Sequence, residues 1–316
     1  MLLNKKKEKS GNSIFPEAVN SAPALACAVL TIMTTAFIAS GAGAFDGFAN
    51  ELILALVQIA AFLIPGLIYF IFYGKGRLTS NFITRGESGC TKFTVISGFL
   101  LVVTVILTKA ISAYMSPSEI SGSVFSENAS VLTIVLVSVI LPPLFEEILV
   151  RGFILSAYEK KCGGALAIVA SSVIFAFLHF SVKDFLTYFA AGIILGTLVY
   201  ITRSVLGAMA VHLINNVISL YFDGAVFKIV SESNSGLVTL FVLTIIFLIL
   251  LYLWLGELEN ICTRRFFKAT EEDKPSQGAR LLPEGYSLAK GARLIVASPY
   301  FLLCAILFLI VSAFII

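Results

Sequence analysis

The sequence predicts an all-α fold, a polytopic membrane bundle of about nine transmembrane helices with its N-terminus inside. Of 316 residues, 58% are hydrophobic and 13% are charged, and the mean hydropathy is +0.97. Soluble proteins are about 45–50% apolar and about 25% charged. No stretch alternates with the period of two that is typical of a membrane β-barrel. The composition therefore excludes a water-soluble globule and a disordered chain, and the net charge of +3 excludes a nucleic-acid-binding surface.

Each predicted helix is an apolar stretch that approaches the roughly 20 residues needed to cross a bilayer. The first stretch exceeds the 7–15 apolar residues usual for a signal peptide, so we expect it to be an uncleaved helix. The nine stretches are Ala24–Ala44, Leu52–Tyr73, Phe93–Tyr114, Val131–Tyr158, Ala165–Phe180, Phe185–Ile201, Val205–Phe222, Leu237–Leu255 and Tyr300–Ile316.

The basic residues predict how the helices are oriented. Of the 22 Lys and Arg residues, 18 lie before the first stretch or in the alternate loops that would share its side. The opposite loops hold only Lys183 and Lys228, while Lys109 and Arg151 lie within apolar stretches. Because Lys and Arg accumulate on the cytoplasmic side, the N-terminus is predicted inside and the C-terminus outside. We expect a bacterial plasma membrane, since no organelle address is visible.

The chain divides into four regions around its polar segments. Residues 1–23 form a cytoplasmic N-terminal segment, residues 24–128 carry the first three helices, residues 129–223 carry four helices, and residues 224–316 carry the last two. Within the last region, a cytoplasmic loop is expected over residues 257–298. Its basic and apolar side chains could rest on anionic lipid headgroups, although an ordinary solvated loop explains it more simply.

The fourth stretch contains charged residues that are costly in a membrane. A charge at the centre of a membrane helix costs about 2.5–3.5 kcal/mol on insertion scales, yet Glu146, Glu147 and Arg151 all lie here. Glu147 and Arg151 are four residues apart and can pair on one helical face. Pro142 and Pro143 are expected to break the helix and to start a new one with the glutamates in its first turn. A surface salt bridge at a helix end is disfavoured, because the chain stays apolar for two further turns.

Both histidines of the chain also lie in apolar stretches. His179 follows Phe175 by four residues and His212 precedes Asn216 by four, so each pair shares a helical face. At about 1.5 Å of rise per residue, Glu146, the imidazoles and the amide lie about 12–22 Å from the inner ends of their helices. Ionisable groups within a membrane indicate a functional site by default.

These groups suit hydrolysis by an activated water molecule. A carboxylate in apolar surroundings suits a general base, an imidazole can share the proton or hold a metal, and an amide with a second imidazole can bind an oxyanion. The sequence contains no nucleophile elbow and no Cys placed near a His by motif. We therefore expect cleavage of a peptide bond inside the membrane.

Three motifs in the stretch Val131–Phe222 resemble those of the CPBP family, the CAAX prenyl endopeptidases and bacteriocin-processing, or Abi-type, intramembrane proteases. Val150 stands where the family more often has an aromatic residue. The motifs are Glu146-Glu147-x-x-x-Arg151, Phe175-x-x-x-His179 and His212-x-x-x-Asn216.

The resemblance implies a role for each polar residue. Glu146 would be the general base, and His179 would hold or assist the attacking water. A zinc ion held by Glu146, His179 and His212 is a further expectation, because family members are commonly labelled metalloproteases and these are zinc ligand types. A glutamate–water mechanism without a metal explains the same residues equally well.

The remaining motif residues would orient and stabilise. Glu147 would pair with Arg151, His212 and Asn216 would form the oxyanion site, and Phe175 would pack the cavity. The expected substrate is a peptide or membrane-anchored protein, either a prenylated CAAX tail or a bacteriocin or signalling peptide. A non-catalytic self-immunity or scaffold protein is the first alternative. A proton-relaying transporter is the second, and the missing inverted repeat counts against it.

Overall fold

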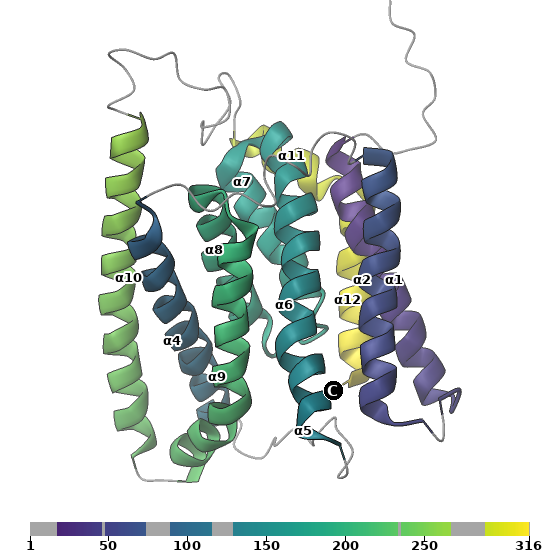
Figure 1. Ribbon diagram of the computed structural model, residues 1–316, viewed down its shortest axis with the longest axis horizontal. Helices are drawn as coiled ribbons and strands as arrows, with labels where there is room; N and C mark the ends of the chain where they lie inside the picture. Colours follow the sequence, from purple (N-terminus) through teal and green to yellow (C-terminus); the bar gives the residue numbers. More distant parts are fainter. Residues whose placement is uncertain are drawn as a thin grey trace, which may run out of the picture.

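The computed structural model of the protein describes residues 18–45, 48–73, 89–115, 129–232, 235–266 and 288–315. These residues form helices joined by short turns, and none of them forms a strand (Figure 1). The predicted all-α, polytopic bundle is confirmed.

The helices stand side by side as a bundle (Figure 1). Helices α1, α2 and α12 form one flank, α4 and α10 form the other, and the helices that carry the three motifs lie between them. In chain order they are α1 (Ala18–Gly41), α2 (Asn50–Tyr73), α4 (Thr91–Met115), α5 (Val131–Val135), the π-helical η1 (Leu136–Ile140), α6 (Leu141–Glu146), the π-helical η2 (Glu147–Leu155), α7 (Ser156–Phe177), α8 (Phe185–Thr202), α9 (Val205–Glu232), α10 (Gly236–Phe266), α11 (Leu288–Val296) and α12 (Pro299–Ile315).

Fewer helices than predicted are long enough to cross a membrane. Seven helices of the described chain meet that length, and the pair α11 and α12, bent by 62°, makes an eighth. The predicted span Ala165–Phe180 is present as a shorter apolar helix, Cys162–Phe177, which does not meet this length. This helix is short because the chain kinks at Gly163. The φ of Gly163 is 78°, a conformation that favours glycine, and it interrupts the helix that comes before. Helix α8 returns antiparallel, so the short α7–α8 pair leaves the orientation of the other helices unchanged.

Most of the described basic residues near helix termini lie at one end of the bundle, which we call the basic end, while Lys183 and Lys228 lie at the other. Helices α1, α4, α7 and α9 begin there, and α2, α8 and α10 end there (Figure 1). Ion pairs fasten this end: Lys92 contacts Glu257 at 2.7 Å, and Arg203 contacts Glu159 at 2.7 Å. The N-terminal lysines and the basic residues of 74–88 and 267–287 lie outside the described residues.

The predicted cytoplasmic loop over residues 257–298 is partly helical. Helix α10 continues to Phe266, well beyond the predicted end at Leu255, and α11 covers Leu288–Val296. The predicted end followed the apolar stretch alone. The helix continues through polar residues because the side chains of its last turns need not lie among apolar neighbours. The predicted headgroup contacts of residues 267–287 lie outside the described residues.

Candidate active site

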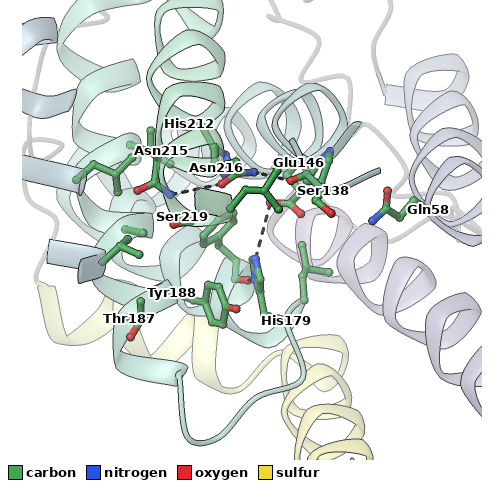
Figure 2. Close-up of a pocket in the computed structure, with 18 of the residues that line it drawn as sticks. Gln58, Ser138, Glu146, His179, Thr187, Tyr188, His212, Asn215, Asn216 and Ser219 are labelled. Carbon is green, nitrogen blue, oxygen red and sulfur yellow. Dashed lines mark hydrogen bonds and ion pairs between the residues drawn. The ribbon is translucent and has the colours of Figure 1, made fainter. Parts of the chain in front are cut away.

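A cavity of about 490 Å³ lies within the bundle and is lined by residues from each of the three motifs (Figure 2). Residues of α1, α2, α4, η1, α6, α7, α8 and α9, together with the turn after α7, line it. Five of the residues singled out from the sequence lie on its wall: Glu146, Phe175, His179, His212 and Asn216. The other two, Glu147 and Arg151, are completely buried beside it, with exposures of 0% and 1%.

The backbone of the fourth span is adapted to this cavity. Pro142 and Pro143 open α6 at its first turn, as predicted, but the helix does not break there. The chain keeps helical dihedral angles and passes through π-helical turns on both sides, so the expected break was wrong. Because Pro142 lacks an N–H group, the carbonyl of Ser138 loses its usual helical donor. Asn216 on α9 supplies a donor instead, with its Nδ2 at 3.3 Å from the Ser138 oxygen.

Glu146 and His179 face each other across the cavity. The Oε2 atom of Glu146 lies 3.9 Å from Nε2 of His179 and has no hydrogen-bond partner among the described residues. Nδ1 of His179 lies 2.8 Å from the carbonyl oxygen of Phe175, which can only accept, so Nδ1 carries the proton. In the neutral ring, Nε2 then presents a lone pair toward Glu146. The aromatic ring of Tyr188 stacks on the imidazole of His179, with 3.7 Å between the ring centroids. This contact fixes the plane of the imidazole.

Glu147, Arg151 and His212 form a buried polar triad. Oε1 of Glu147 accepts from Arg151 Nη1 at 3.1 Å and from His212 Nδ1 at 2.8 Å. Arg151 also donates to the Gly192 carbonyl at 3.4 Å, and its guanidinium lies 4.3 Å above the Phe175 ring. The pairing predicted for Glu147 and Arg151 is present, while the contact with His212 was not foreseen. This contact leaves Nε2 of His212 as the ring atom available to the cavity.

The predicted metal ligands were tested against the geometry. Among the described residues, no group of three His, Cys, Asp or Glu side chains lies close enough to hold a metal ion. The predicted trio of Glu146, His179 and His212 is therefore not brought together as a set of metal ligands in this arrangement.

Several residues of the site were missed by sequence reasoning. Tyr188 lies in no motif, and its spacing from His179 across a turn gave no signal. Asn215 donates to Oδ1 of Asn216 at 3.4 Å, and its adjacency to Asn216 was the available clue. Lys109 was noted as a charge within a span, but nothing connected it with the cavity that it lines.

Comparison with known proteins places the motif segment. Residues 128–218 match the family model described as Rce1-like, type II CAAX prenyl endopeptidase. The match covers 91 of the 316 residues, and over this segment the chain is similar to the CAAX-type intramembrane proteases. No curated protein and no solved structure matches the chain.

The matched segment carries all three motifs but only part of the cavity wall. Helices α1, α2 and α4 contribute wall residues from outside the matched range, among them Met33, Gln58 and Lys109. The match therefore supports a peptide hydrolase in a membrane, while these wall residues lie outside the matched range.

Proposed function

We propose that the protein is an intramembrane endopeptidase that hydrolyses a peptide bond of a membrane-associated peptide or protein, with Glu146 as the general base. The observation that carries the proposal is the 3.9 Å approach of Glu146 Oε2 to His179 Nε2 inside a cavity that also holds His212 and Asn216. A separation of this size between two acceptors suits a bridging water that donates to both.

The attack follows from these contacts. Glu146 takes a proton from the bridging water while the oxygen of that water bonds to the substrate carbonyl carbon. The carbonyl electron pair moves onto the carbonyl oxygen. Glu146 then gives the proton to the departing amine as the C–N bond breaks. His179 holds the water through Nε2, because its other nitrogen is occupied by the Phe175 carbonyl.

The oxyanion would be stabilised from α9. His212 would donate from Nε2 as an imidazolium, because its Nδ1 already donates to Glu147. Asn216 has a second amide hydrogen besides the one directed to Ser138. Loss of one oxyanion donor costs about 10²–10³ in kcat in well-studied hydrolases.

The test is cleavage by the purified full chain of a peptide library that contains prenylated and unprenylated tails. General-base catalysis contributes about 10²–10⁴, so Glu146→Gln should lower kcat by that factor. Glu259→Gln is the matched control, because Glu259 is exposed on α10; it should cleave as the wild type does. A chelator arm tests the metal expectation, and the preferred tail identifies the substrate class.

Two results would contradict the proposal. One is full activity in Glu146→Gln. The other is no cleavage of any tail by the wild type, together with a cellular phenotype that survives Glu146→Gln; that pair of findings would indicate a self-immunity or scaffold protein of the same fold.

A further inference from the structure

The side chain of Gln58 on α2 faces the cavity. Gln58 lines the cavity together with Leu54, which lies four residues earlier on the same face of the helix. Figure 2 shows the Gln58 side chain extending from α2 toward Ser138 of the fourth span. This amide therefore reaches the wall from outside the segment that matches the protease family.

The oxygen of this amide is unpaired. The Oε1 atom of Gln58 is buried and has no hydrogen-bond partner among the residues that the structure describes. Buried amides are nearly always hydrogen-bonded, because an unpaired acceptor loses water without gaining a donor. The loss is larger in a membrane, since lipid tails offer no donor. A leucine or methionine would suit this apolar helix without such a loss, so the amide indicates a ligand that carries a donor.

A contact between two aromatic rings sets the level of Gln58 relative to the proposed general base. The rings of Phe62 and Phe145 are stacked, with 6.2 Å between their centroids and an angle of 19° between their planes. Phe145 immediately precedes Glu146. Phe62 follows Gln58 by four residues, which rise about 6 Å in an α-helix. Gln58 therefore lies about one helical turn from the level of Glu146 along the bundle.

This offset suits a peptide in an extended conformation. An extended chain advances about 3.3 Å per residue, so about 6 Å corresponds to two residues. The backbone N–H and carbonyl groups of such a peptide need partners inside a membrane. A glutamine amide both donates and accepts, so it can pair with a peptide backbone as a neighbouring strand does. The last torsion of the side chain is broad, which lets the oxygen turn toward the peptide.

We propose that Gln58 binds the backbone of the substrate peptide, with its Oε1 atom accepting the N–H group of a residue about two positions from the cleaved bond. The inference rests on the proposed peptidase function and adds a substrate-binding residue from outside the three motifs. It also adds a feature of the substrate, which is held in an extended conformation and carries a free N–H group at that position. Proline is therefore disfavoured there.

Peptides with single ester bonds test this hydrogen bond. Each peptide has one backbone N–H group replaced by an ester oxygen, at successive positions on both sides of the cleaved amide bond, so that the side chains stay the same. Loss of a neutral hydrogen bond weakens binding about fivefold. For the ester at one position about two residues from the cleaved bond, the wild type should lose about this factor in kcat/KM. Gln58→Met should cleave that ester peptide and its all-amide parent equally well.

Thr34→Val is the matched control. The Oγ1 atom of Thr34 on α1 is also buried without a hydrogen-bond partner among the described residues, but Thr34 does not line the cavity. This variant should show the same loss with the ester peptide as the wild type. Because both variants remove an unpaired polar atom, neither should lower the thermal unfolding temperature in detergent.

Three results would overturn the inference while the peptidase function stands. The first is an ester loss in Gln58→Met equal to that of the wild type, and the second is a wild type that cleaves every ester peptide as fast as the parent. The third is a lower unfolding temperature in Gln58→Met, which would assign the amide to folding and not to the substrate. A wild type that cleaves no peptide at all would overturn both the inference and the peptidase function.

Discussion

At the scale of single residues, the site depends on neighbours that fix each imidazole by its Nδ1 atom. The Phe175 carbonyl and the Glu147 carboxylate accept these two hydrogens, so both rings are oriented before substrate arrives. The motif spacing predicted which residues meet, because positions four apart share a helical face. It could not predict the ring orientations, which depend on contacts between helices that are distant in sequence.

Tyr188 is expected to act as a positioning residue for His179. Its ring stacks on the imidazole at 3.7 Å, and stacking needs the aromatic plane rather than the hydroxyl group. Tyr188→Leu should therefore lower kcat by about tenfold, the effect of a mispositioned catalytic group being up to about 10²-fold. Tyr188→Phe should restore most of the rate with an unchanged KM. Equal losses in both variants would show that the hydroxyl, and not the stacking, matters.

Arg151 is expected to be the most costly charge to remove. Its loss leaves the Glu147 carboxylate buried without its cation, and breaking a buried pair costs about 3–5 kcal/mol. Arg151→Met should lower the free energy of unfolding in detergent by about that amount, while Arg203→Met, from a partly exposed pair, should cost less. The double variant Glu147→Gln with Arg151→Met should recover part of the loss. No recovery would mean that the methionine, and not the stranded charge, destabilises the bundle.

At the scale of helices, the sequence predicted most elements and missed their irregularities. Apolar length and the positions of Lys and Arg suffice for straight helices, because the bilayer requires both. The kink at Gly163, the π-helical turns around Pro142 and the helix α11 depend on packing and backbone geometry that no hydropathy pattern contains. These irregular segments lie around the cavity or at the ends of the bundle.

The close approach of α7 and α8 should depend on Gly192. A Cβ atom there would lie 2.8 Å from Cβ and 2.9 Å from Cα of Ser172, so the two helices would have to separate. Overpacking of this kind costs about 1–3 kcal/mol, and Gly192→Ala should lower the free energy of unfolding by that amount. Gly256→Ala is the control, since nothing lies within 4 Å of its added Cβ atom. A loss as large at Gly256 would attribute the effect to the general response of a membrane helix.

Pro142 is expected to lower the stability of its helix while it leaves the Ser138 carbonyl available to Asn216. Pro142→Ala returns an N–H group to the backbone and lets it compete with Asn216 for the Ser138 oxygen. We expect a protein at least as stable in thermal unfolding but slower in peptide cleavage, because Asn216 loses its anchor beside the cavity. Unchanged cleavage kinetics would show that Asn216 takes no part in the reaction.

At the scale of the whole molecule, orientation relative to the membrane decides which peptides can reach the site. The basic residues predict that α10 ends inside and that the far turns of α9 lie outside. In a chain with its own cysteines replaced, Lys228→Cys should react with an impermeant thiol reagent in intact cells. Glu259→Cys, near the basic end, should react only after permeabilisation. The reversed pattern would show that the bundle has the opposite orientation in the membrane.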